Sequence, residues 1–220
     1  MKRALVIGAS GGVGGAVAAE LEARGLEVTR ISRRIDGLDV TDDMSVARVL
    51  GALAGPFDLV FVATGILAPR DGHPEKSLDQ IDATAFAEVL AVNTIGTALV
   101  LRQVPRLLAR EGCPVVAVLT ARVGSIGDNA LGGWYAYRAS KAAANQIVRT
   151  AAIEIGRKHK SAVVVALHPG TVATAFTDHY PGHKKVSPKD AAKNLIRVVD
   201  GLKPGDNGRF LDWAGAEVPW

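Results

Sequence analysis

The stretch "WYAYRASKAAANQ" (134–146) places Tyr137 four residues before Lys141. If the stretch is helical, as its alanine content favours, the two side chains lie on one face, one turn apart. A phenol has a pKa near 10, and a neighbouring ammonium favours its ionised form. Such a pair can serve as an acid–base group, but an isolated Y-x-x-x-K spacing is more often ordinary helix surface. The chemical interpretation therefore depends on companion motifs.

A glycine run supplies the first companion. "GASGGVGG" (8–15) follows the apolar residues "ALVI" and opens a predicted helix. Glycines at positions 8, 12 and 14 permit a tight turn and let backbone N–H groups approach a pyrophosphate at a positive helix N-terminus. Alone, a glycine-rich turn is weak evidence. Between a first strand and a first helix, it predicts phosphate binding.

Short β-branched runs alternate with longer helical patterns along the chain. We expect strands at 3–8, 27–32, 57–64, 114–120, 162–168 and 208–213, and helices at 13–24, 42–53, 78–110, 134–158 and 188–202. This alternation is typical of βαβ units and a mostly parallel sheet, and the apolar strands predict helices on both faces. We predict one α/β domain over residues 1–220, a doubly wound parallel sheet with its ligand at the carboxyl ends of the strands.

Six stretches in order resemble the short-chain dehydrogenase/reductase family: the glycine run, "LDV" (38–40), "VATG" (62–65), "VNTIGT" (92–97), "YRASK" (137–141) and "HPGTVAT" (168–174). Within it, 121–129, "GGWYAYRASKAAANQ" and 208–220 are similar to the C-factor and sniffer-type carbonyl reductase branch. The resemblance implies a single-domain Rossmann-type fold. It also implies an oxidoreductase that moves hydride between a nicotinamide cofactor and a carbonyl or secondary alcohol. The alternative is a dinucleotide-binding regulatory or signalling protein on the same fold.

The resemblance assigns roles to three residues. Tyr137 would be the acid/base, Lys141 would tune it, and Asn93 would help to hold the lysine through a water. A buried amide also needs hydrogen-bond partners in the core, and the two interpretations of Asn93 are compatible.

The substrate-oxygen donor departs from the family pattern. Where the family commonly has two serines, this chain has Thr120 and Ala121. We expect Ser125 to reach back as the donor. The alternatives are Thr120 acting through a water, or a less polar site.

The end of the second strand favours NADP(H) over NAD(H). Ser32 stands where an acid would accept from the 2′-hydroxyl of NAD, and Arg33 and Arg34 follow. A guanidinium suits a 2′-phosphate. By resemblance the remaining cofactor contacts are Gly8, Ser10, Gly12, Val13, Gly14, Asp39, Val40, Ala63, Thr64, Gly65, Pro169, Gly170, Val172 and Thr174.

Other features limit the partners. The net charge is +4, but the basic residues are scattered with few aromatics between them, which argues against nucleic acid. The one cysteine provides neither a disulfide framework nor a metal cluster and suits a reducing compartment. Glycines interrupt the apolar start, so we expect no signal peptide, no membrane span and a cytoplasmic location.

The loop at 175–187 is polar and contains glycine, and we expect it to cover the substrate, with His179 and His183 as loop residues rather than catalysts. The family resemblance implies a homodimer or homotetramer.

Overall fold

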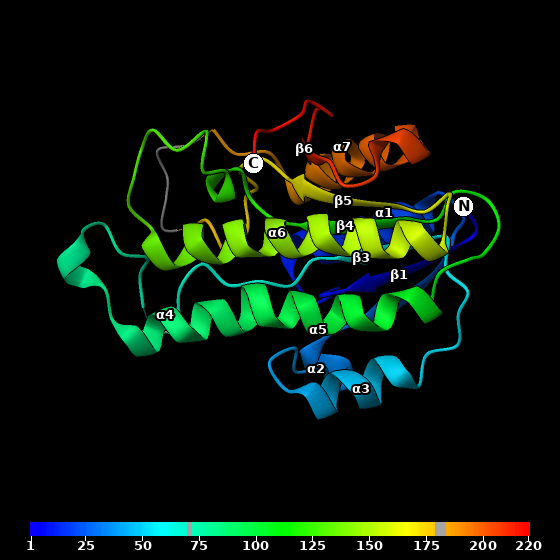
Figure 1. Ribbon diagram of the computed structural model, residues 1–220, viewed down its shortest axis with the longest axis horizontal. Helices are drawn as coiled ribbons and strands as arrows, with labels where there is room; N and C mark the ends of the chain where they lie inside the picture. Colours follow the sequence, from blue (N-terminus) through cyan, green and yellow to red (C-terminus); the bar gives the residue numbers. More distant parts are fainter. Residues whose placement is uncertain (70–71, 179–183) are drawn as a thin grey trace.

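The computed structural model describes residues 1–69, 72–178 and 184–220, and it contains one six-stranded sheet (Figure 1). The predicted cover segment is therefore only partly described, and His179 and His183 lie outside the described residues. All strand pairings within the sheet are parallel, in the order β2-β1-β3-β4-β5-β6. The strands are β1 (Arg3–Ile7), β2 (Glu27–Ile31), β3 (Leu59–Val62), β4 (Val115–Leu119), β5 (Val163–His168) and β6 (Phe210–Asp212).

Helices cover both faces of the sheet, as the apolar strands predicted. They are α1 (Gly12–Ala23), α2 (Arg33–Asp36), α3 (Asp43–Gly51), α4 (Ala83–Leu90), α5 (Gly96–Gln103), α6 (Tyr135–Lys158) and α7 (Pro188–Gly201). Alternate strand residues enter two separate cores. Val116 and Val118 pack on the side of Val148 in α6, whereas Ala117 packs on the side of Leu195 in α7. The α/β fold with a doubly wound parallel sheet is confirmed.

The helix predicted at 78–110 is divided into several pieces. A 3₁₀ turn (Leu78–Gln80) precedes α4, a π-helical turn (Ala91–Ile95) joins α4 to α5, and a second 3₁₀ turn (Val104–Arg106) follows. The π turn carries Asn93, which is fully buried. Such turns locally widen a helix and are frequent at functional sites.

This composite helix, Ala83–Arg106, is long enough and apolar enough to cross a membrane by length and composition, with a mean hydropathy of 1.6. Length and composition alone are weak evidence for a membrane span, so the expectation that the chain has none stays a prediction. A core helix of a soluble protein passes the same test, and Val89, Val100 and Val104 are buried in the fold.

The strand order places the ligand crevice. From β1 the chain passes to β2 on one side and later returns to pair β3 on the other side of β1. In open α/β sheets the crevice lies beyond the carboxyl ends of the strands at this reversal. The glycine run and the segments after β3, β4 and β5 all begin there.

Candidate active site

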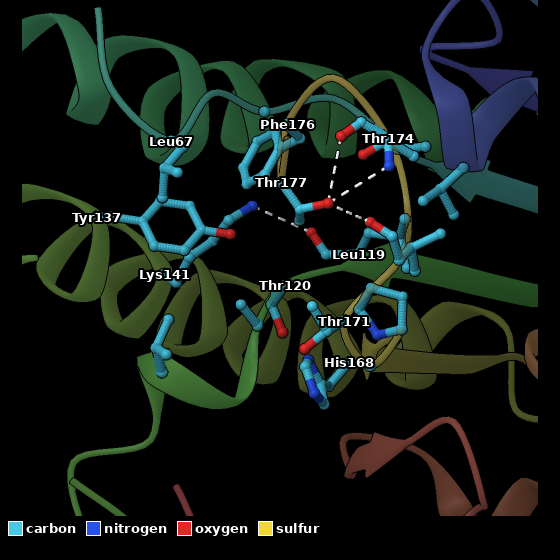
Figure 2. A pocket seen from close by; sticks show the side chains of 18 of the residues that line it. Leu67, Leu119, Thr120, Tyr137, Lys141, His168, Thr171, Thr174, Phe176 and Thr177 are labelled. Atoms are coloured by element: carbon cyan, nitrogen blue, oxygen red, sulfur yellow. Dashed lines mark hydrogen bonds between the residues drawn. The ribbon is translucent and has the colours of Figure 1, made fainter. Parts of the chain in front are cut away.

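A cavity of about 510 Å³ lies at the carboxyl ends of the strands. It runs from the glycine turn before α1 to the first turn of α6 and the segment that follows β5 (Figure 2). Its wall includes Gly12, Val13, Gly14, Ala63, Thr64, Gly65, Leu67, Thr120, Ala121, Val123, Leu131, Trp134, Tyr137, Lys141, His168, Pro169, Gly170, Val172, Thr174 and Phe176.

Tyr137 and Lys141 share one face of α6 and both line this cavity. The Lys141 Nζ lies 5.8 Å from the centre of the Tyr137 ring and donates to the Leu119 carbonyl at 3.3 Å. The side chains are 6% and 4% exposed, respectively, so both lie almost entirely in the protein interior. Figure 2 shows the phenol hydroxyl directed into the cavity, with the lysine beside it. The predicted juxtaposition is confirmed.

Burial determines the proton affinities of the pair. It raises the pKa of the Tyr137 phenol above its ordinary value and lowers the pKa of Lys141 to about 8. From the spacing, we expected the Lys141 ammonium to lower the pKa of the Tyr137 phenol. In the folded chain desolvation is the larger effect on Tyr137. The phenol is therefore protonated at neutral pH and able to donate a proton.

Asn93 lies behind the pair and joins three segments. Its Oδ1 accepts from the Ile66 N–H at 2.8 Å, and its Nδ2 donates to the Ile66 carbonyl at 2.8 Å and to Ser140 Oγ at 3.0 Å. Ser140 Oγ in turn donates to the Tyr137 carbonyl at 2.8 Å. A Cβ on Gly65 would lie 3.1 Å from Asn93 Oδ1 and 3.2 Å from Lys141 Nζ, which places both atoms close to that glycine. The hydrogen bonds expected of a buried amide are present, and the water relay stays a prediction.

The structure does not bring Ser125 to the cavity. A 3₁₀ turn (Arg122–Gly124) carries the chain away after Ala121, and Ser125 Oγ accepts from the Asp128 N–H at 3.1 Å. Thr120 and Ala121 line the cavity instead. Thr120 is 4% exposed, and its Oγ1 has no hydrogen-bond partner among the described residues.

The glycines of the first turn are required by close packing within the protein. A Cβ on Gly12 would lie 2.4 Å from Thr174 Cγ2, and one on Gly14 would lie 2.4 Å from the Gly8 carbonyl oxygen. Gly8 itself has φ +89° and packs against the Ala63 backbone. Within the described residues the N-cap of α1, Gly11, provides no side-chain cap, so the first N–H groups of the helix can receive an anion. Ser10 in the same turn is exposed.

The expected adenosine residues lie at the other end of the crevice, after β2. Ser32 caps the short helix α2, because its Oγ accepts from the Ile35 N–H at 3.2 Å. The sequence had not predicted this helix. Arg33 and Arg34 are exposed, and within the described part of the chain neither guanidinium forms a hydrogen bond or a salt bridge, although the charge of Arg33 helps to lower the pKa of Asp39. The Asp39 carboxylate accepts from Thr41, and Val40 packs against the π-turn side of α5 at Gly96. These residues fit an adenosine phosphate.

The comparisons decide the family. The sequence profile described as "Enoyl-(Acyl carrier protein) reductase" matches residues 8–203. A Rhodococcus protein named 1-hydroxy-2-glutathionyl-2-methyl-3-butene dehydrogenase is 32% identical over the full length of both chains. The chain belongs to the short-chain dehydrogenase/reductase family. It is an NAD(P)-dependent oxidoreductase of that family.

Further relatives agree with this family. The C-signal protein of Myxococcus xanthus is 37% identical over 66% of this chain and 84% of its own length. Among solved structures, the NADPH-bound carbonyl reductase from chicken fatty liver matches with a TM-score of 0.85 at 22% identity, covering 100% of this chain and 94% of that one. The Drosophila melanogaster carbonyl reductase Sniffer matches with a TM-score of 0.79 at 20% identity, covering both chains fully. These two structures share the fold.

His168 and Leu67 are among the wall residues that the sequence did not assign to the site. His168 ends β5 and faces Thr120 across the pairing of β4 with β5, in which the Thr120 N–H donates to the Leu167 carbonyl at 2.9 Å. Its Nδ1 is buried with no partner among the described residues, and burial with the charge of Arg122 lowers its pKa to about 4. Leu67 joins the wall from the loop after β3. His168 could have been assigned to the site because it directly precedes Pro169 and Gly170, which were expected to contact the cofactor. Nothing in the sequence around Leu67 indicates that it lines the cavity.

Proposed function

We propose that this protein is an NADP(H)-dependent carbonyl reductase that uses Tyr137 as its acid. The carrying observation is the buried Tyr137 and Lys141 pair on the wall of a cavity that begins at the glycine turn. A carbonyl reduced by hydride needs one proton at its oxygen, and a positioned acid supplies it. The bound nicotinamide would supply the hydride to carbon, and this chain would supply the proton.

The chain's residues divide the remaining work. Tyr137 donates its hydroxyl proton to the substrate oxygen as the carbonyl becomes an alcohol. Lys141, held by the Leu119 carbonyl, stabilises the phenolate that remains. Thr120 takes the place expected for Ser125, because it lines the cavity and its buried hydroxyl, which has no partner among the described residues, would reach a ligand oxygen by rotation about the Cα–Cβ bond. In the reverse direction Tyr137 accepts the proton of an alcohol.

NADP(H) is proposed over NAD(H) on the arginine pair at α2. Both guanidiniums are exposed, and neither forms a salt bridge within the described residues, so both can turn towards a 2′-phosphate. A fork of donors matches a phosphate well. The similar structures from chicken liver and from Pseudomonas aeruginosa were solved with NADPH and NADP, which agrees with this assignment.

The substrate end of the cavity favours a carbonyl with an apolar body. Tyr137 is flanked by Trp134, with ring centres 6.1 Å apart, and by Phe176, with ring centres 5.8 Å apart. Leu67 and Leu131 complete this part of the wall. The Rhodococcus relative is named for oxidation of an alcohol, the direction in which the same proton returns to Tyr137.

Turnover with Tyr137→Phe tests the proposal. Loss of NADPH absorbance is followed with a panel of aldehydes and ketones for the wild-type protein and the variant. We expect the variant to lose about 10²–10⁴-fold in kcat, the usual contribution of a positioned acid, while NADPH affinity changes only a few-fold. A variant that keeps most of the wild-type rate removes Tyr137 from the mechanism. No turnover of any panel member by the wild-type protein would favour the regulatory alternative.

We also propose that the protein is cytoplasmic and a homodimer or homotetramer, that its only partners are small molecules, and that it binds neither nucleic acid nor membrane. The scattered basic residues support the first exclusion. Light scattering on the purified protein measures the oligomeric state.

A further inference from the structure

The catalytic helix α6 begins without a cap of its own. Its N-cap residue is Trp134, which has φ +55° and makes no side-chain capping bond. Gly132 and Gly133 before it have φ +66° and φ +65°, so three successive residues occupy the left-handed region. That conformation is unfavourable for a tryptophan, and the first N–H groups of a helix need acceptors. Acceptors for these N–H groups must come from outside the helix.

Glu75 supplies acceptors at the start of α6. Its carbonyl accepts from the Trp134 N–H at 2.5 Å, and its carboxylate Oε2 accepts from the Ala136 N–H at 3.2 Å. The residue lies 61 positions before Ala136 and is 8% exposed. A carboxylate at a helix N-terminus is also favoured by the helix dipole. One residue thus satisfies two backbone donors at the start of α6.

Residues that precede Glu75 in the loop after β3 also contact the site. Ile66 exchanges two hydrogen bonds with Asn93, both of 2.8 Å, and the next residue, Leu67, lines the cavity. Within the turn itself, Arg138 Nε donates to the Gly133 carbonyl at 2.9 Å. The start of α6 is therefore located by contacts from a distant loop.

We propose that Glu75 is a positioning residue that sets the place of Tyr137, and this rests on the proposed role of Tyr137 as the acid. Tyr137 directly follows Ala136, the residue whose N–H binds the carboxylate. A displacement of about 1 Å in a reacting group can reduce rate about 10²-fold. Loss of the Glu75 carboxylate lets the first turn shift and with it the phenol hydroxyl. Glu75 is not among the described residues that line the cavity, whereas the glycine turn at α1 is, so we expect cofactor binding to be spared.

The experiment compares Glu75→Ala with Glu75→Gln, using steady-state kinetics with one carbonyl and NADPH titration. We expect Glu75→Ala to lower kcat about 10–100-fold, with the carbonyl KM and the NADPH Kd changed less than about 3-fold. Glu75→Gln keeps an oxygen at the same reach and should recover kcat to within about 5-fold of wild type.

Asp82→Ala is the matched control. Asp82 caps α4 through its Oδ1, which accepts from the Ala85 N–H at 2.8 Å, so its loss removes a similar carboxylate cap from another helix. We expect a comparable change in melting temperature and a wild-type kcat. All rates are measured at a temperature where each protein is folded.

Wild-type kcat in folded Glu75→Ala, or an equal loss in Asp82→Ala, overturns the proposal. Should Glu75→Ala fail to fold, Glu75→Asp replaces it, because aspartate keeps the charge but retracts the oxygen. A lower kcat for Glu75→Asp than for Glu75→Gln supports positioning by the hydrogen bond, and the reverse order overturns it. A wild-type rate in Tyr137→Phe would instead contradict the proposed role of Tyr137 as the acid. That measurement does not depend on the Glu75 variants.

Discussion

At the scale of single residues, burial decides the charges of Tyr137 and Lys141. The pKa of Lys141 is lowered to about 8 because the ammonium is desolvated, while the phenol beside it stays protonated. Below about pH 8 the lysine carries a positive charge, which in the proposed mechanism stabilises the phenolate forming on Tyr137. Above that pH it loses the proton and the stabilisation together.

We therefore expect kcat/KM for carbonyl reduction to fall as pH rises through about 8, because kcat/KM reports the ionisation of the free enzyme. The measurement is a pH profile of NADPH consumption at limiting carbonyl. Lys141→Met should be slow and lack this step. A profile in which the wild-type rate rises through this range would contradict the assignment.

The oxygen donor is also a question of single residues. Thr120→Val removes the unpartnered hydroxyl at nearly constant shape, and it should lower kcat about 10²–10³-fold if Thr120 acts like other donors to a developing oxyanion. Ser125→Ala should cost much less, since Ser125 Oγ is bound to the Asp128 N–H away from the cavity. Both variants are compared with one carbonyl substrate.

The control restores a hydroxyl at the position where the family commonly has serine. Ala121→Ser in the Thr120→Val background should recover part of the lost rate, because Ala121 lines the same cavity. If Ser125→Ala is the slower enzyme, Ser125 is the donor after all.

At the scale of elements, the hydrophobic periodicity and the turn residues of the sequence predicted the strands of the sheet. Each of the six strands lies within its predicted range, because buried parallel strands are short apolar runs bounded by turns. The features that the sequence did not predict depend on local hydrogen bonding or on contacts between distant segments. The π turn at Asn93 and the 3₁₀ turn that removes Ser125 leave no periodic signal. Glu75 could not be assigned either, since its partner helix lies 61 residues away.

The short helix α2 carries a prediction of its own. It presents Arg33 and Arg34 beyond the end of β2, and each charge-assisted hydrogen bond to a phosphate contributes about 1.5–3 kcal/mol. Arg33→Asp should therefore abolish or reverse the preference for NADPH, because the carboxylate repels the 2′-phosphate and accepts from a free 2′-hydroxyl. Fluorescence titration with both cofactors measures the ratio of Kd values. Equal wild-type Kd values for NADH and NADPH would refute the assignment.

At the scale of the whole molecule, one cavity wall group ties the stability of the fold to pH. His168 ends β5 at the carboxyl end of the sheet, where the cavity lies, and its pKa is lowered to about 4 by burial and by Arg122, against the opposing charge of Asp212. The unfolded chain has the ordinary histidine value near 6.5. Between these values the unfolded chain binds the proton and the folded one does not. The contribution is therefore complete above about pH 6.5 and is lost as pH falls towards 4.

We expect His168 to account for up to about 3 kcal/mol of the stability that the protein loses between pH 7 and pH 4, the free energy equivalent of the difference between the two pKa values. Urea unfolding of the wild-type protein and of His168→Gln at both pH values isolates it, because the carboxylates titrate alike in the two proteins. The variant should lose less stability on acidification, even if it is the less stable protein at pH 7. An equal loss in both would mean that the folded protein accommodates a charged imidazole, and that the neutral histidine beside Thr120 is not a fixed feature of the cavity wall.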